Sequence, residues 1–203
     1  WNHTQKLRNN QNFNANTTYS SNGDYNRNYG LNVAQRMDQK ATSNVTYSKR
    51  WPDSKNSLSI NLYSNRDLLV DKKVDRASNY FVSPTNSRSQ INISNKTLPK
   101  ISFRHGQSSL FPSSALNKKW YNNINWNYGF NFTKKDKNYY KSVFSDSLNS
   151  YDWQRDENGN AIDTLFQDAG WTHTASLNAP IKILKHININ PNINFRSNWV
   201  NRY

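Results

Sequence analysis

The ten residues from 123 to 132, NINWNYGFNF, alternate strictly between polar and apolar side chains. Every second residue is aliphatic or aromatic, from Ile124 through Trp126 to Phe132, and every residue between them is asparagine or glycine. Successive side chains of a β-strand point to opposite faces of its sheet. The segment therefore predicts a strand with one apolar face and one face of amides.

Period-two alternation recurs along the whole chain, whereas no stretch places its apolar residues at helical spacing. It is clearest again in residues 186–199, HININPNINFRSNW. Strands that follow one another and pair as neighbours form an antiparallel meander, so the predicted fold class is all-β with about eight antiparallel strands. The predicted strands cover residues 12–20, 29–33, 41–51, 57–64, 91–103, 123–132, 171–179 and 186–199.

The predicted connections differ at the two ends of the sheet. Short turns such as SNGD (21–24) and PDSK (52–55) lie at one end, and long loops at about 67–87 and 134–168 lie at the other. All 13 acidic residues fall in these turns and loops or at their edges. Tight turns at one end and long loops at the other are typical of an outer-membrane β-barrel.

Two prolines, Pro99 and Pro191, fall inside alternating runs. Proline has no N–H to donate to a ladder, so each predicts a bulge or a strand boundary.

The composition argues against an ordinary packed core. Only 34% of residues are hydrophobic and the mean hydropathy is −1.03, yet 14% are aromatic, which argues against disorder. The predicted polar faces carry amides, hydroxyls and glycine, which suit a barrel lumen better than the charged outer face of a soluble sandwich. We therefore expect residues 1–203 to be a segment of a single transmembrane outer-membrane β-barrel domain.

This interpretation assigns two sets of residues. The lipid-facing set is Ile124, Trp126, Tyr128, Phe130, Phe132, Ile187, Ile189, Ile193 and Phe195. The aromatic girdle, expected near strand ends at the membrane interfaces, is Trp51, Trp120, Tyr121, Trp171 and Trp199.

The sequence offers little for catalysis or metal binding. It has no cysteine, which removes disulfides, thiolate catalysis and Cys-ligated zinc. DENGNAID (156–163) matches a calcium loop only in part, because Ala161 stands where glycine is required, and its Asn-Gly pair favours a hairpin turn. We expect no enzyme, no metal and no cofactor, since no triad context is present and the histidines fit no ligand spacing. The four histidines are His3, His105, His173 and His186.

The net charge of +14 suggests nucleic acid at first. However, lysines and arginines fall in pairs at predicted strand ends, for example at 49–50 and 118–119, and not along one stripe. We interpret them as a basic solvated rim and expect no nucleic-acid partner.

Six segments together resemble the LptD family of lipopolysaccharide-assembly proteins in their order and spacing. They are WNHTQKL (1–7), SNVTYSKRWPDSKNSLSINLYSNRD (43–67), TLPKISF (97–103), KKWYNNINWNYGFNF (118–132), DENGNAIDT (156–164) and HTASLNAPIKILKHININPNINF (173–195). The resemblance implies a translocon in the bacterial outer membrane that passes lipopolysaccharide to the outer leaflet, with a plug lipoprotein and periplasmic bridge proteins as partners. Because the chain begins at Trp1 without Met, we expect an internal segment of the barrel, without its lateral opening.

Four basic residues in or beside predicted strands are candidate contacts for lipopolysaccharide phosphates: Lys96, Lys100, Arg104 and Arg196. The alternative is that they extend to the rim and neutralise their neighbours there. Two other functions fit the same pattern. One is a different outer-membrane barrel, such as a TonB-dependent receptor or porin, and the other is a secreted all-β module that stacks its Tyr and Trp rings on carbohydrate.

Overall fold

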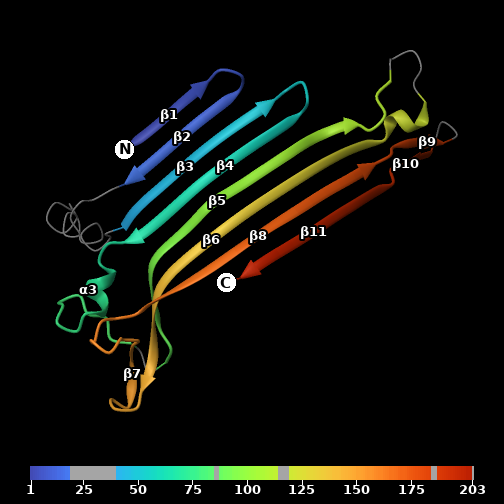
Figure 1. Cartoon of the computed structure of the whole chain (residues 1–203). Helices are drawn as coiled ribbons and strands as arrows, with labels where there is room; N and C mark the ends of the chain where they lie inside the picture. The colour runs from blue at the N-terminus through green and yellow to red at the C-terminus, as the bar shows by residue number, and fades with distance from the viewer. Residues whose placement is uncertain (19–39, 85–86, 114–118, 184–186, 203) are drawn as a thin grey trace.

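The computed structural model describes residues 1–18, 40–84, 87–113, 119–183 and 187–202. Within them one antiparallel sheet places its strands in the order β1-β2-β3-β4-β5-β6-β8-β11, with the short β7 paired to the end of β6 (Figure 1). This confirms the predicted all-β antiparallel meander. The strands are β1 (Asn2–Leu7), β2 (Gln11–Thr18), β3 (Lys40–Trp51), β4 (Asn56–Asp67), β5 (Gln90–Ser109), β6 (Asn125–Ser145), β7 (Ser150–Trp153), β8 (Asp163–Asn178) and β11 (Asn192–Arg202).

Three smaller elements interrupt the connections. Helix α3 (Val70–Val74) follows β4, the 3-10 turn η2 (Trp120–Asn123) precedes β6, and a separate hairpin of β9 (Ile181–Ile183) and β10 (Ile187–Ile189) joins β8 to β11. The predicted strand at 186–199 is therefore divided at Pro191, one of the two outcomes expected there. Ile187 and Ile189 belong to the small hairpin and not to the main sheet, which corrects their assignment to the same continuous strand as Ile193.

Pro99 lies inside β5 at a register shift. Thr97 pairs with Lys135 and Lys100 with Thr133, so β5 carries one more residue than β6 over this interval. The shift on the β4 side falls at the same place. The prediction of a bulge or boundary at Pro99 is confirmed as a bulge.

Several strand borders differ from the predictions. The first strand, β1, was not predicted, and the predicted strand at 29–33 lies outside the described residues, as does the SNGD turn. The predicted long loop at 134–168 is wrong over most of its length, because β6 continues to Ser145 and β8 begins at Asp163. The lysines from 134 to 137 pair instead with β5 or β8, and Asp136 between them lies inside a strand rather than in a loop.

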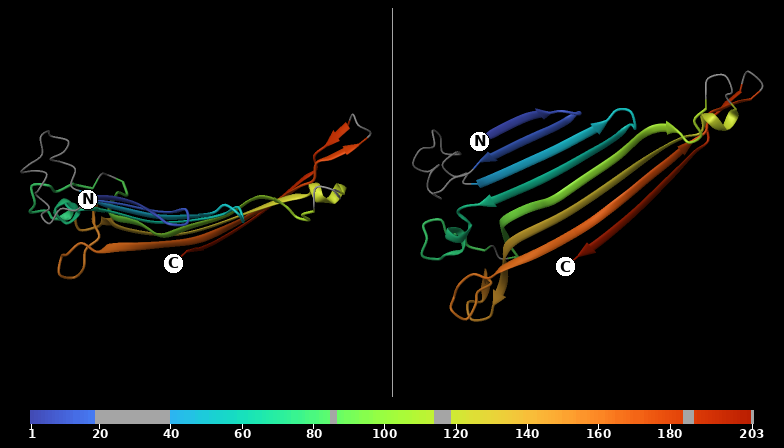
Figure 2. Two further views of the ribbon diagram at one scale, coloured as in Figure 1. Left: turned by 90° about the horizontal axis from the view of Figure 1, so that it is seen from above. Right: turned by 45° about the horizontal axis from the view of Figure 1, so that its top comes forward.

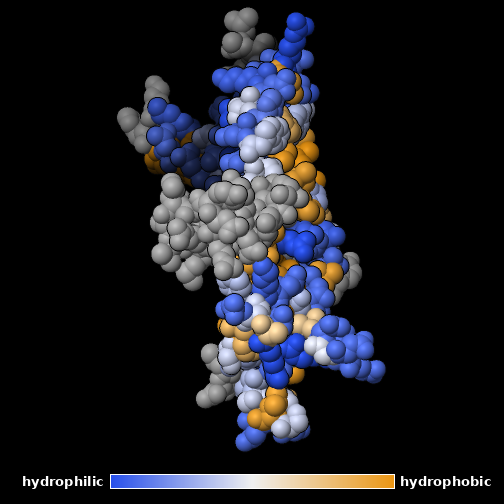
Figure 3. Space-filling model, turned by 90° about the vertical axis from the view of Figure 1, so that its left-hand side faces the viewer, coloured by the Kyte–Doolittle hydropathy of each residue, from blue (hydrophilic) through white to orange (hydrophobic). Residues whose placement is uncertain are grey.

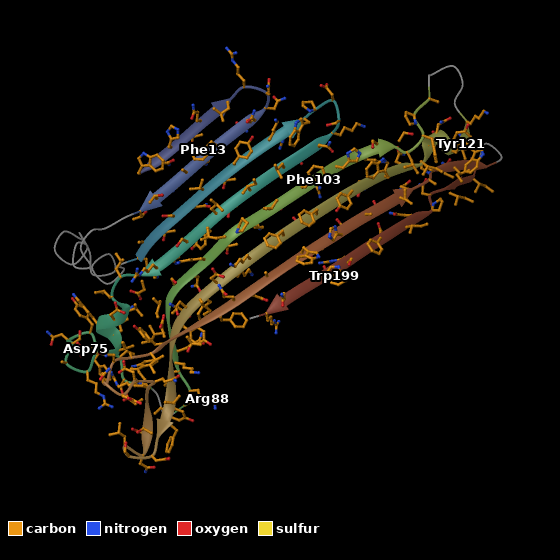
Figure 4. The ribbon with its side chains drawn as sticks, viewed as in Figure 1. Phe13, Asp75, Arg88, Phe103, Tyr121 and Trp199 are labelled. Carbon is orange, nitrogen blue, oxygen red and sulfur yellow. The ribbon has the colours of Figure 1, made fainter. Side chains whose placement is uncertain are left out.

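The tight turns at residues 8–10 and 52–55 lie at one end of the sheet, here called the short-turn end, but two longer connections lie there as well (Figure 1). The predicted division into one end of short turns and one end of long loops therefore holds only in part; the other end is here called the long-loop end. Residues 8–10, 52–55, 110–124 and 179–191 connect strands at one end, and residues 68–89 and 146–162 connect them at the other. In Figure 4, Tyr121 marks the first end, and Asp75 and Arg88 mark the second.

The second end contains a small packed unit, here called the cap (residues 69–82 and 142–162). Leu69, Val70 and Val74 around α3 are almost fully buried, as is Trp153 of β7. The indole N–H of Trp153 donates to the carbonyl of Val82 at 2.9 Å. Packing of apolar groups in the described chain is thus concentrated beside the sheet, not over it.

The main sheet is curved and carries no second layer over most of its length (Figure 2). Hydrophobic side chains gather along one side of it and polar ones along the other (Figure 3). The chain exposes 14768 Å², whereas a compact monomeric protein of 23.8 kDa exposes about 9,900 Å². The sheet is also open, because β1 and β11 end it and do not pair with each other. In the described part of the chain, no helix has the length and apolar character needed to cross a membrane.

Candidate functional site

The apolar face of the sheet is built by cross-strand rows of large side chains. Phe130 lies opposite Phe103 of β5 and His173 of β8, while Phe132 lies opposite Trp171, which in turn lies opposite Trp199 of β11. The rings of Phe132 and Trp171 are 6.5 Å apart, as are those of Trp171 and Trp199. Such offset aromatic pairs stabilise adjacent strands without a covering layer.

The face extends across the width of the sheet, from Phe13 on β2 through Phe103 on β5 to Trp199 on β11 (Figure 4). Its side chains are exposed at the β11 edge, where Ile193 is 68% and Phe195 60% exposed. A contiguous apolar face of this size in a folded chain marks a surface that contacts lipid or another protein.

The register brings together most of the predicted lipid-facing set. The members that share this face are Trp126, Tyr128, Phe130, Phe132, Ile193 and Phe195. Ile124 ends η2 just before β6 and takes no part in the sheet ladder, and Ile187 and Ile189 lie in the β9–β10 hairpin. That this shared face contacts lipid stays a prediction.

The predicted aromatic girdle divides into two groups. Trp51 ends β3, and Trp120 and Tyr121 lie in η2, so these three are at the short-turn end of the sheet. Trp171 and Trp199 lie instead inside β8 and β11, where they face each other across the two strands.

Three histidines are described, and two of them make polar contacts on the apolar face. His105 stacks on Trp126 and contacts Asn56 and Ser108 through its two ring nitrogens. His173 contacts the hydroxyl of Tyr128 at 2.7 Å. Among the described residues no three His, Cys, Asp or Glu side chains come close enough together to hold a metal ion, and His186 lies outside this part of the chain.

The opposite face is concave and polar. It encloses an open hollow of about 1390 Å³, lined mainly by hydroxyl, amide and glycine residues of β1 to β8 and of the β1–β2 turn. Short hydrogen bonds join side chains of neighbouring strands here: Ser102 donates to Asn131 at 2.6 Å, and Asn61 donates to Asn44 at 2.6 Å. These bonds pair polar groups of neighbouring strands with each other, and the concave face stays hydrophilic.

Basic side chains lie among the polar residues that line the hollow. Lys6, Lys49, Arg50 and Arg104 line the hollow, and among the described residues that line it none is Asp or Glu. Lys100 lines a smaller adjoining pocket with Thr97. An open hollow of this charge favours anionic groups.

Three of the four basic residues named from the sequence lie on the concave face. Lys100, Arg104 and Arg196 pair with Thr133, Gly129 and Thr174 respectively, all on the polar side of β6 and β8. Lys96 does not join them, because its partner in the register is Asp136, on the opposite face. Arg50 was missed as a site residue, although it has the same parity along β3 as Thr46 and Ser48.

The DENGNAID segment forms a tight turn in the cap. The backbone N–H groups of Asn158 and Asn160 donate to the Asp156 carboxylate at 3.0 and 2.8 Å. Donation by Asn160 is the main reason why the pKa of Asp156 is below its ordinary value. The hairpin interpretation is confirmed, since Arg155 and Ala161 form a β-bridge on either side of the turn.

Comparison with known proteins adds a family assignment. No curated protein and no solved structure matches the chain. The family model described as LptD protein matches residues 1–203, and this match over the whole chain confirms the resemblance found in the sequence. The chain belongs to the LptD protein family.

Proposed function

We propose that this chain forms part of an outer-membrane β-barrel that delivers lipopolysaccharide to the outer leaflet, with its apolar face toward lipid and its concave polar face toward the barrel interior. The LptD family assignment gives the chain a role in lipopolysaccharide transport or assembly, and proteins of this family belong to the outer membrane. The barrel itself, its membrane depth and its route for lipopolysaccharide are the finer parts of the proposal.

The observation that carries the proposal is a sheet with two opposed surfaces, over most of which the described residues place no second protein layer. The rings of Trp171, Phe195 and Trp199 are 40 to 60% exposed on one side, and the hollow lies on the other. If the chain were in water, its extended apolar face would contact the solvent, whereas soluble proteins cover a face of this size with other parts of the protein. Lipid on that face and water in the hollow satisfy both surfaces at once, as in a membrane barrel.

The two open edges point to completion by further strands. β1 and β11 each leave a row of N–H and C=O groups without a sheet partner in the described chain. In lipid such rows are strongly unfavourable, so strands elsewhere in the longer protein would close the sheet. The plug lipoprotein and the periplasmic bridge proteins are proposed partners on the ground of the family alone.

Transport through such a segment requires no covalent chemistry. The concave face offers hydroxyl, amide and guanidinium groups along a water-accessible path, and these can hold and release a polar head group by hydrogen bonds. We therefore propose a conduit or wall and not an enzyme.

Spin-label accessibility tests the placement of the two faces. Single cysteines would be introduced from Asn125 to Thr133 in the full-length protein, after removal of any native cysteines, and labelled in reconstituted membranes. Oxygen access should peak at positions 126, 128, 130 and 132, and a water-soluble quencher should peak at 127, 129, 131 and 133. Closure of the even positions to both reagents would place them against protein, which would refute the membrane orientation and favour a soluble module.

A further inference from the structure

Three arginines lie in a single transverse row on the concave face. Across the sheet, the register aligns Arg50 with Ser57, Ser57 with Arg104, Arg104 with Gly129, Gly129 with Thr174, and Thr174 with Arg196. Neighbouring strands are about 4.8 Å apart, so Arg50 and Arg104 leave the sheet roughly 10 Å from each other. Two side chains of this length, starting from alternate strands, can converge on one small group between them.

Within the part of the chain that the structure describes, the guanidinium groups of this row have no anionic partner. Elsewhere in the described chain arginines meet carboxylates: Arg76 and Arg155 contact Asp152, and Arg202 lies 3.8 Å from Asp168. In the described part of the molecule no carboxylate lies within 4.0 Å of Arg50, Arg104 or Arg196, and the side-chain contact found for Arg196 is to the amide oxygen of Asn198. Their positive charge is therefore available to a ligand.

The floor between the arginines is open and rich in neutral polar groups. Ser57 separates Arg50 from Arg104, and Ser102 lies one row away. On the other side of Arg104, a Cβ added to Gly129 would lie 2.6 Å from the hydroxyl oxygen of Thr174, so glycine is the residue that fits there. The hydroxyl of Thr174 fills the space over Gly129 and donates to its carbonyl at 3.3 Å, so the row between Arg104 and Arg196 is neutral and polar.

We propose that Arg50 and Arg104 form a binding site for a phosphate monoester, with Arg196 as a further cation in the same row. A guanidinium group binds a phosphate through two parallel N–H donors. One arginine can satisfy a carboxylate, whereas a phosphate monoester carries close to two negative charges and three acceptor oxygens, which match two arginines and the hydroxyl of Ser57. This inference deepens the proposed function and rests on it, because it names the group of the transported lipid that the concave face recognises.

Binding measurements on the full-length protein in detergent micelles test the site. Three probes are compared: bisphosphorylated lipid A, dephosphorylated lipid A with the same acyl chains, and inorganic phosphate. Wild-type protein should bind the phosphorylated lipid at least about tenfold more tightly than the dephosphorylated one, the ratio expected for a charge-assisted contact. The double variant Arg50→Gln, Arg104→Gln should lose this preference.

A matched control carries Lys96→Gln and Lys134→Gln, which removes two positive charges from the opposite face of β5 and β6, at residues that do not line the hollow. It should keep the preference, which separates a local site from net charge. The variant Arg50→Lys, Arg104→Lys keeps the charge but loses the forked donors, and it should bind with intermediate affinity. Comparable circular dichroism of all variants establishes that they fold.

The possible outcomes distinguish a lipid-borne phosphate from free phosphate, and one of them refutes the site. Loss of lipid discrimination in the glutamine variant supports a lipid-borne phosphate, whereas loss of inorganic phosphate binding with no lipid discrimination supports free phosphate at the same arginines. If the double glutamine variant at Arg50 and Arg104 binds each of the three probes with the same affinity as the control with two lysines replaced, the site is refuted. The spin-label pattern on β6 does not depend on these arginines, so the proposed orientation can stand when the phosphate site fails, and the reverse.

Discussion

Replacing Trp153 by alanine should open the cap while leaving the main sheet paired. Trp153 is 2% exposed and donates its indole N–H to Val82 in the segment after α3, and within α3 Val70 is 1% and Val74 4% exposed. A fully buried Trp→Ala change costs about 3–5 kcal/mol, and here it also leaves the carbonyl of Val82 without its indole donor. The sheet keeps its own ladders, so we expect the loss to appear as local opening and not as global unfolding.

Hydrogen exchange of the full-length protein in micelles measures this opening. The amide of Val82, which donates to Lys73 at 2.8 Å, and the amide of Ile162, which donates to Gln154 at 2.8 Å, report on the cap. A loss of 3 kcal/mol corresponds to about a hundredfold faster exchange of these amides. Phe144→Ala is the matched control, because this ring of the same hairpin is 52% exposed. Unchanged exchange in Trp153→Ala, or equal acceleration in strand amides of β6, would refute the cap as a separate packed unit.

Two further predictions concern close contacts and pH. Gly170→Ala should weaken the pairing of β8 with β11, because the added Cβ would lie 2.9 Å from the backbone carbonyl oxygen of Trp199. In semi-native electrophoresis, the compact band of the variant should be lost at a lower temperature than that of the wild type. An unchanged temperature would count against the close approach. The turn at Asp156 should loosen in acid: its folded pKa is depressed, so its contribution to stability is present above the unfolded value of about 3.9 and is lost as pH falls through the folded value. Faster relative exchange of the Asn160 amide below that pH would support this, and in Asp156→Asn the acid dependence should disappear.

The sequence predicted the sheet best where apolar and polar residues alternate. β6 from Trp126 to Phe132 and β8 from Trp171 to Leu177 were predicted as neighbouring strands with the correct alternation, since an apolar face opposite a polar face appears in the sequence as period two. Residues 134–145 lack that period. Their strand exists because β5 and β8 provide ladders on both sides as far as Tyr140, and β7 pairs with residues 142–145. β1 was missed for the same reason, since the segment from 2 to 7 contains a single aliphatic residue, Leu7.

The candidate site was predictable only in part, because it depends on register between strands far apart in sequence. Alternation alone placed Arg196 and Arg104 opposite the apolar side chains of their own strands. It could not align them with each other or with Arg50, whose neighbour Lys49 suggested a basic pair at a turn. Pairing through Ser57, Gly129 and Thr174 creates the row, and none of these three carries a charge that would have indicated a site.

The bulge at Pro99 decides which cations of β5 reach the hollow. Lys96, Lys100 and Arg104 have the same parity, so a regular strand would place all three on one face. The extra residue between Thr97 and Lys100 reverses the alternation of side chains along β5. Lys96 therefore lies on the apolar face, where it pairs with Asp136, whereas Lys100 and Arg104 lie on the concave polar face. A lysine beside an aspartate can neutralise it near the long-loop end of the sheet, whereas an arginine among serines and glycine keeps its charge for a ligand. The same irregularity thus separates a structural cation from the cations of the proposed phosphate site.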